Sequence, residues 1–235
     1  YNLKLFLTKE GYLKKIPLVS LRANPEHKLK EDDVVIQEVE SHNKADLLLF
    51  SNKHTVYKMK LYEIDDCKAS SLGDYLVNVL QLDSDEKIIY IVATDDYKGY
   101  MLFAYENGKI AKIHLNSYAT KTNRKKLANA YSDIDKLVHM QYLAEDMDLV
   151  AISSINKVLV FNTSSINPKA SRDSQGVQVL ASKKNSRMVA VKILEQVRLN
   201  DVDYYRTKNI PAVGCYLKEN DSIDGKVQMR LDEVE

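Results

Sequence analysis

The stretch LFLTKEGYLKK at residues 5–15 recurs three more times along the chain, and this recurrence decides the fold. The later copies are LLFSNKHTVYK at residues 48–58, LFAYENGKIAK at residues 102–112 and AISSINKVLV at residues 151–160. Their anchor positions, 8, 51, 105 and 153, lie 43, 54 and 48 residues apart. Repeats with periods in this range are typical of propellers and solenoids. We therefore interpret the chain as a series of blades.

Each copy has the pattern of a β-hairpin. The apolar run supplies one strand, and the alternating segment after the turn supplies the returning strand. The turn position holds Gly11, Gly108 or Asn156, which suits a backbone with positive φ. His54 occupies this position in the second copy and tolerates that conformation better than most residues. We expect four hairpins, the second of them slightly strained.

A second phrase follows each hairpin: a polar loop, a short alternating apolar segment, and a charged turn. It occurs five times, at residues 29–34, 73–88, 128–137, 176–188 and 212–223, whereas a fifth hairpin is reduced to the segment 189–194. The fold predicted is all-β, a propeller-like disc of about five four-stranded blades, with ring closure left open. The blades are expected at residues 1–45, 46–98, 99–146, 147–190 and, incomplete, 191–225, all within one domain over residues 1–235.

One segment is ambiguous. Leu127, Tyr131, Ile134 and Val138 have helical spacing, so residues 126–145 can also be interpreted as a helix. The position of this segment within the repeat favours strand.

Composition restricts the setting more than the partner. The formal net charge is +1, which does not identify a partner. Cys67 and Cys215 form no recognisable motif, so we expect structural thiols in a reducing, cytoplasmic protein. No apolar run approaches the roughly 18 residues of a membrane span, so no membrane partner is expected.

Catalytic motifs are not recognisable. The five histidines show no metal-ligand spacing, and no Gly-rich phosphate loop or Gly-x-Ser-x-Gly elbow occurs. Acidic pairs such as Asp32-Asp33, Asp65-Asp66 and Asp95-Asp96 fall at expected turns, where aspartate accepts local hydrogen bonds. We expect no catalytic residue and no metal site.

Basic residues fall at matching positions of successive copies. Some follow the hairpin turns and others fill the connecting loops, so a disc would bring them to one curved rim suited to bent DNA. The alternative is that lysines at strand ends only keep edges soluble. The predicted phosphate contacts are Lys14, Lys15, Arg22, Lys58, Lys60, Lys112, Lys121, Arg124, Lys125, Lys126, Lys169 and Arg172.

Several of these phrases together resemble a known family. They are residues 8–18, 49–53, 56–64, 76–82 and 174–177, and the similarity extends over most of residues 3–190. The chain resembles the C-terminal domain of the A subunit of bacterial type IIA topoisomerases, a family comprising DNA gyrase and topoisomerase IV. The resemblance implies a β-pinwheel, in which neighbouring blades exchange strands and a basic rim binds and bends duplex DNA.

The chain departs from the gyrase pattern in two ways: the reduced fifth hairpin leaves fewer blades than the six usual in gyrase, and one segment lacks a characteristic box. Gyrase members that wrap DNA carry a Gln-Arg-Arg-Gly-Gly-x-Gly box, whereas residues 22–31 here read RANPEHKLKE. That stretch lacks the glycines and most of the positive charge. The resemblance is therefore closer to topoisomerase IV, with a gyrase domain whose box has degenerated as the alternative.

The resemblance also implies what this piece contributes. Strand cleavage, ATP hydrolysis and the Mg²⁺ requirement belong to other parts of the parent enzyme, including its ATPase B subunit, and no cofactor is expected in this chain. A propeller-like protein-interaction module is the competing hypothesis. The acidic residues Asp221, Asp224, Asp232, Glu233 and Glu235 either form a solvated tail or compete with DNA, and we favour the tail.

Overall fold

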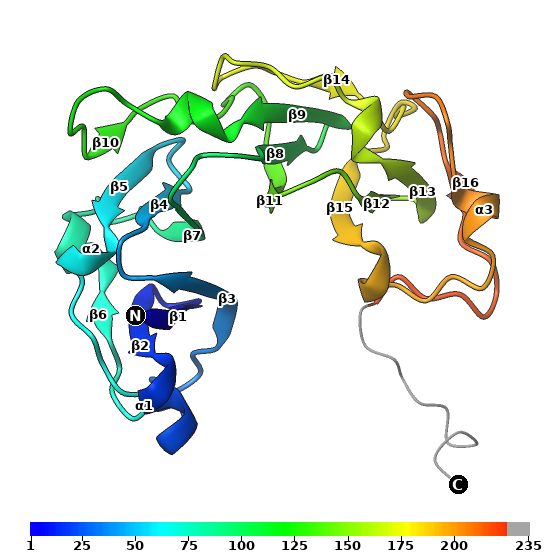
Figure 1. Ribbon diagram of the computed structural model, residues 1–235. Helices are drawn as coiled ribbons and strands as arrows, with labels where there is room; N and C mark the ends of the chain where they lie inside the picture. Colours follow the sequence, from blue (N-terminus) through cyan, green and yellow to red (C-terminus); the bar gives the residue numbers. More distant parts are fainter. Residues whose placement is uncertain (225–235) are drawn as a thin grey trace, which may run out of the picture. The chain divides into compact units, whose positions relative to one another are not determined.

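The computed structural model describes residues 1–224, and its regular secondary structure is mainly short antiparallel strands (Figure 1). The strands are β1 (Asn2–Thr8), β2 (Tyr12–Pro17), β3 (Val35–His42), β4 (Asp46–Ser51), β5 (Val56–Lys60), β6 (Asp74–Tyr75), β7 (Ile88–Thr94), β8 (Tyr100–Tyr105), β9 (Lys109–His114), β10 (Lys126–Leu127), β11 (Leu137–Leu143), β12 (Asp148–Ser153), β13 (Lys157–Asn162), β14 (Val177–Gln178), β15 (Met188–Ile193) and β16 (Cys215–Tyr216). The helices are short: α1 (Leu18–Ala23), α2 (Leu76–Leu80), α3 (Val202–Tyr205) and the 3₁₀ turns η1 (Leu61–Glu63), η2 (Leu115–Tyr118), η3 (Thr163–Ser165) and η4 (Leu194–Gln196).

These strands form four sheets of four strands each. The orders are β3-β1-β2-β6, β10-β5-β4-β7, β11-β8-β9-β14 and β15-β12-β13-β16. In the first three sheets, the strand beside the returning hairpin strand comes from beyond the next hairpin along the chain. For example, β6 follows β4 and β5 in sequence but pairs with β2. This exchange of strands confirms the all-β, pinwheel-type fold predicted from the sequence.

The hairpin turns have the predicted backbone. Gly11, His54, Gly108 and Asn156 all have positive φ, between 57° and 95°. The buried anchor side chains close these turns: Thr8 Oγ1 accepts from Tyr12 N and Ser153 Oγ from Lys157 N, each at 3.0 Å. At three of the four anchors a small hydroxyl thus accepts a backbone N–H inside the turn, whereas the remaining anchor is Tyr105.

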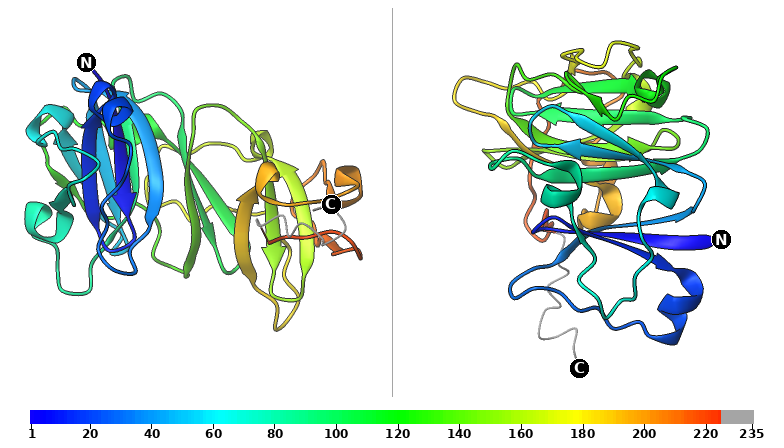
Figure 2. Two further views of the ribbon diagram at one scale, coloured as in Figure 1. Left: turned by 90° about the horizontal axis from the view of Figure 1, so that it is seen from below. Right: turned by 90° about the vertical axis from the view of Figure 1, so that its left-hand side faces the viewer.

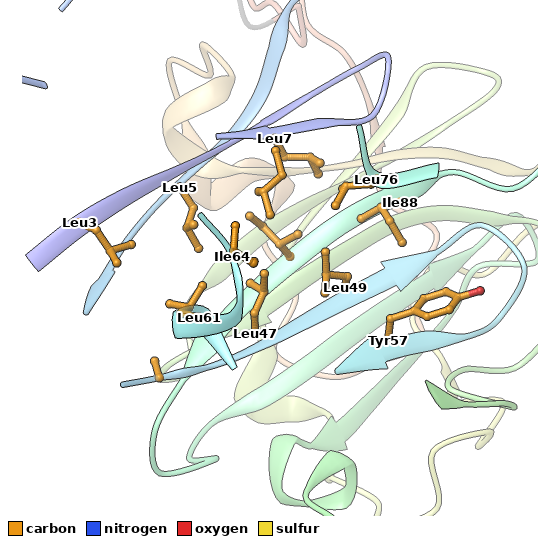
Figure 3. Close-up of a cluster of buried hydrophobic side chains, with 13 residues drawn as sticks. Leu3, Leu5, Leu7, Leu47, Leu49, Tyr57, Leu61, Ile64, Leu76 and Ile88 are labelled. Carbon is orange, nitrogen blue, oxygen red and sulfur yellow. The ribbon is translucent and has the colours of Figure 1, made fainter. Parts of the chain in front are cut away.

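The chain divides into two units, each containing two sheets. Unit 1 comprises Tyr1–Lys98 and Leu115–Ser132, and unit 2 comprises Gly99–His114 and the residues from Asp133 onward. In unit 1, Leu3, Leu5 and Leu7 of β1 face Leu47 and Leu49 of β4, with neither set exposed (Figure 3). The core of this unit therefore lies between its two sheets, whose twisted strands are visible in Figure 2.

Unit 2 repeats this arrangement. Leu102 and Ala104 of β8 belong to the same buried cluster as Leu149 and Ala151 of β12. Alternate side chains on each strand enter the cluster, as expected for a strand with one face on a shared core.

The blade count differs from the prediction of about five. The described residues form four sheets, because the segment beyond residue 190 completes the fourth sheet instead of beginning another. The apolar run interpreted as a reduced fifth hairpin is mostly β15, which pairs with β12, and β16 pairs with β13. The strand interpretation of residues 126–145 is confirmed, since these residues form β10, loops and β11 with no helix.

Acidic residues at the charged turns are structural. Asp33 Oδ1 accepts from Glu10 N at 2.9 Å, and Asp135 Oδ2 accepts from Asn107 N at 2.7 Å. Asp221 accepts from Asn200 N at 2.9 Å and from Tyr205 Oη at 2.5 Å. Asp221 therefore belongs to the fold of unit 2, whereas Asp232, Glu233 and Glu235 lie outside the described residues.

Candidate nucleic-acid interface

Unit 1 gathers basic side chains along the outer edge of its second sheet. The loop between η2 and β10 runs beside β5, where Lys58 N donates to Lys125 O at 2.8 Å. Lys126 then pairs with Tyr57 of β5, and its Nζ lies 5.5 Å from the tyrosine ring centroid. We define the unit 1 basic patch as Lys58, Lys60, Lys121, Arg124, Lys125 and Lys126.

A pocket of about 310 Å³ lies within this patch, lined by Lys58, Lys60, Arg124 and Lys125 among others. Lys58 Nζ donates to Thr120 Oγ1 at 2.9 Å and lies 5.5 Å from the Tyr97 ring centroid. Lys60 pairs with Asp46, and hydrogen bonding to that carboxylate raises the pKa of Lys60. The pocket is therefore concave and predominantly cationic, which suits an anionic ligand.

Lys121, Arg124, Lys125 and Lys126 of the patch are exposed. They occupy one loop and the short strand that follows it, so their charges act on the same region of surface. Lys58 in the middle of β5 and Lys60 at its end are partly exposed. Of the predicted phosphate contacts in unit 1, these six are brought together, whereas Arg22 is exposed on α1 and lies outside the pocket.

Unit 2 has a weaker counterpart at the equivalent place in its repeat. In unit 2 the loop residue donates to the strand, Lys169 N to Lys112 O at 2.8 Å. In unit 1 the strand residue donates to the loop, Lys58 N to Lys125 O. Lys169 is exposed and lines a pocket of about 320 Å³, whereas Arg172 is partly buried. The equivalent loop in unit 2 therefore carries fewer exposed cations than the loop in unit 1.

Lys14, Lys15 and Lys112 are not exposed, contrary to the prediction of a rim position. Lys14 is 0% exposed, and its Nζ lies 2.6 Å from Lys28 O, 2.9 Å from Ala69 O and 3.1 Å from His27 Nδ1. Lys15 Nζ donates to Asn43 Oδ1 at 2.6 Å and Leu61 O at 2.9 Å. These ammonium groups are held inside the protein.

Lys112 is 3% exposed and is held in a similar way, by Asp146 Oδ1 at 2.6 Å and Thr163 O at 3.2 Å. Burial alone would raise the pKa of Asp146, but the hydrogen bonds from Lys112 and Thr163 outweigh it and lower this pKa. All three lysines lie on inner strands, β2 and β9, which are paired on both edges, and their ammonium groups reach acceptors inside the protein. Lys58 holds the equivalent position on the inner strand β5 but stays partly exposed, so an inner strand allows this burial without requiring it.

One basic surface was missed from the sequence. Lys183, Lys184 and Arg187 are exposed in the turn before β15, and Arg187 Nε lies 3.6 Å from Glu106 Oε2. The adjacent pair Lys183-Lys184 in a polar loop was the available signal, but the prediction concentrated on hairpin ends and on the loops before the exchanged strands.

Other site types receive no support within residues 1–224. No group of three or more His, Cys, Asp or Glu side chains there could hold a metal ion. In the same range, no helix is long and apolar enough to cross a membrane.

Comparison with known proteins gives consistent matches. A family model described as "DNA gyrase C-terminal domain, beta-propeller" matches residues 5–25, 45–95 and 148–195. The A subunit of DNA gyrase from Staphylococcus aureus (strain NCTC 8325 / PS 47) is 25% identical over 207 residues, which cover 84% of this chain and 23% of the relative. The chain thus spans about a quarter of the length of the curated relatives it matches.

Solved structures agree. The C-terminal domain of a DNA topoisomerase IV superposes with a TM-score of 0.70 at 25% identity, covering 84% of this chain and 63% of that one. The E. coli ParC C-terminal domain has a TM-score of 0.70 at 12% identity, covering 93% of this chain and 95% of that one. At that identity the likeness to ParC shows the fold alone. Since the family model matches half of its residues, the chain belongs to the DNA gyrase C-terminal domain, beta-propeller family.

Proposed function

We propose that this chain is a non-catalytic domain that binds and bends duplex DNA for a type IIA topoisomerase. The observation that carries the proposal is the unit 1 basic patch, in which four exposed cations occupy residues 121–126 beside Lys58 and Lys60. Phosphate contacts of this kind supply sequence-independent affinity for DNA. Family membership supports the same role, since the matching family is the DNA gyrase C-terminal domain and the solved structure at 25% identity is the C-terminal domain of a DNA topoisomerase IV.

The parent enzyme is part of the proposal. We infer an A subunit that works in the cytoplasm with an ATPase B subunit, and that requires ATP and Mg²⁺ for strand passage elsewhere in the protein. This domain then selects which DNA segment is presented, without a cofactor of its own.

We further infer a topoisomerase IV-like role instead of chiral wrapping. The segment at residues 22–31, which stands where gyrase has its wrapping box, is tied to the interior of unit 1. Lys14 Nζ donates to the carbonyl of Lys28, and the His27 ring packs against Phe6 at 4.4 Å between centroids. Glu26 and Glu31 are exposed in this segment, and their negative charges repel the phosphate groups of DNA.

DNA binding is tested by fluorescence anisotropy with a duplex of ~30 base pairs at several salt concentrations. The slope of log K against log salt is negative, and the double variant Arg124→Glu/Lys125→Glu should reduce its magnitude by about two. Each lost phosphate contact reduces this magnitude by about one. Lys183→Glu/Lys184→Glu makes the same change in net charge elsewhere in the chain and should leave the slope nearly unchanged. Equal losses in both variants would show that net charge acts instead of the patch.

The mode of DNA deformation needs a separate assay. Plasmid relaxed by a type I enzyme in the presence of the domain should show no trapped positive writhe if the domain bends without wrapping. Trapped positive writhe would instead support the gyrase-like alternative.

A further inference from the structure

The pocket in the unit 1 basic patch has a feature that duplex binding does not require. Tyr62 of η1 is 63% exposed and lines this pocket together with the basic side chains. An exposed aromatic ring beside several cations is the combination that proteins use to hold an unstacked nucleotide, since the ring stacks on the base while the cations bind the phosphate.

The size of the pocket also points beyond a bare phosphate. At about 310 Å³ it is close to the lower bound of small-molecule sites, which is about 300 Å³. A phosphate group alone would leave most of this volume to water, whereas a phosphate with its sugar and base would use it.

The chemistry of the lining favours a phosphate ester. Lys58, Arg124 and Lys125 provide cationic donors, and Thr122 and Asn123 add polar groups. The two acidic lining residues are Asp46 and Glu63. Asp46 is occupied within the protein, since it pairs with Lys60 and accepts from Tyr97 Oη at 2.7 Å.

We propose that this pocket binds a single nucleotide, with the phosphate held by Arg124, Lys125 and Lys58 and the base stacked on Tyr62. The nucleotide comes from one of two sources with the same chemistry: a free nucleoside phosphate, or an unpaired nucleotide of a DNA strand. The inference goes beyond duplex binding and does not depend on it.

Unit 2 supplies an internal control. Its pocket at the equivalent place in the repeat is of similar size, about 320 Å³, and is lined by Lys112 and Lys169. Lys112 is committed to Asp146, and the lining residues of this pocket include no aromatic side chain. Nucleotide binding should therefore change the NMR chemical shifts of residues 58–63 and 120–125 and leave those of residues 166–177 unchanged.

The experiment is a ¹⁵N-resolved NMR titration of the whole chain with dTMP, thymidine, inorganic phosphate and a four-nucleotide oligothymidylate. The shifts should localise to residues 58–63 and 120–125, and dTMP should bind at least fivefold more tightly than phosphate or thymidine. Tyr62→Leu should weaken dTMP binding about fivefold or more, and Arg124→Gln/Lys125→Gln about tenfold or more, while Lys169→Gln should have no effect. All the substituted side chains are exposed, so the fold should persist, as unchanged spectra elsewhere would verify.

The outcomes separate the possibilities. Tighter binding of the oligonucleotide than of dTMP assigns the site to an unpaired strand, and equal binding assigns it to free nucleotide. Binding of phosphate as tightly as dTMP, or equal shifts in the unit 2 pocket, overturns the proposal. Duplex anisotropy of Tyr62→Leu keeps the two hypotheses apart: it should match the unmodified chain even if dTMP binding is lost.

Discussion

Replacing Lys112 with methionine tests whether this buried lysine serves the fold or the DNA. Methionine retains most of the apolar length of the side chain but cannot donate to Asp146 Oδ1 or Thr163 O. Hydrogen bonds involving a charged group contribute about 1.5–3 kcal/mol each. The loss is moderated because the Asp146 side chain is 37% exposed and regains water, and because the ammonium no longer has to be desolvated.

We therefore expect Lys112→Met to lower the free energy of unfolding by about 2 kcal/mol. For a chain of this length that corresponds to a decrease in Tm of roughly 4–8 °C. Thermal and urea denaturation followed by circular dichroism measure both quantities. The control is Lys136→Met, whose side chain is 79% exposed and lies 3.5 Å from Glu106, and which should change the free energy of unfolding by less than about 0.5 kcal/mol.

The stability of Lys112→Met should also depend on pH differently from that of the unmodified chain. The pKa of Asp146 is lowered in the folded chain, so the unfolded chain binds protons more readily as the pH falls. The stability from this pair is therefore complete above the unfolded-state pKa of about 3.9 and is lost as the pH falls through the folded value. Lys112→Met should lose less stability across that acidic range than the unmodified chain.

DNA binding provides the decisive comparison. If Lys112 is structural, folded Lys112→Met keeps the salt slope of the unmodified chain. A slope of log K against log salt that is smaller in magnitude by about one, with a Tm within about 2 °C of the unmodified chain, would refute the structural role of Lys112. It would restore the rim position predicted from the sequence.

Three further predictions concern the fold. Burial and the nearby Lys14 charge lower the pKa of His27, so the unfolded chain binds more protons and stability should fall as the pH drops below about 6.5. His27→Gln should therefore show a smaller decrease in Tm between pH 7.5 and 5.5 than the unmodified chain. Gly73→Ala should lower the free energy of unfolding, measured by urea denaturation, by several kcal/mol, because the added Cβ would lie 2.4 Å from Leu13 O. Gly11→Ala, whose Cβ would have its nearest contact at 3.9 Å, should lower it by only about 1–2 kcal/mol because of the positive φ, and equal losses would contradict the clash. Tyr131→Phe removes the donor to the buried Ser51 O at 2.6 Å and should cost about 1–2 kcal/mol by thermal denaturation; an unchanged Tm would mean that water replaces the hydroxyl.

The hairpins could be predicted because local chemistry determines them. Gly11, Gly108 and Asn156 tolerate positive φ, and the apolar runs before them leave strand as the consistent interpretation. The strand exchange was available only through family resemblance. The exchanged strands β6, β10 and β14 are two residues long, as is β16, and this is too short for a periodic pattern.

The buried lysines were mispredicted because lysine at a strand end usually indicates an exposed edge. One signal was present: Leu13-Lys14-Lys15-Ile16 does not alternate. In an inner strand covered on both faces, adjacent lysines must then be satisfied by internal acceptors. The six clustered cations of unit 1 were all named from the sequence, but the pocket and Tyr62 required the three-dimensional arrangement of β5, η1 and the loop before β10.

The borrowed strands also bear on how such a chain can gain or lose a repeat. Removing only the hairpin at residues 46–60 would leave β7 and β10, the strands that pair with its two sides, without partners. A viable duplication or deletion must therefore join equivalent points of two repeats, so that every hairpin still receives an edge strand from downstream. Evolution of copy number in this architecture should be confined to such in-phase recombination, and the last sheet must obtain its closing strand from sequence that no longer encodes a hairpin, as β16 does here.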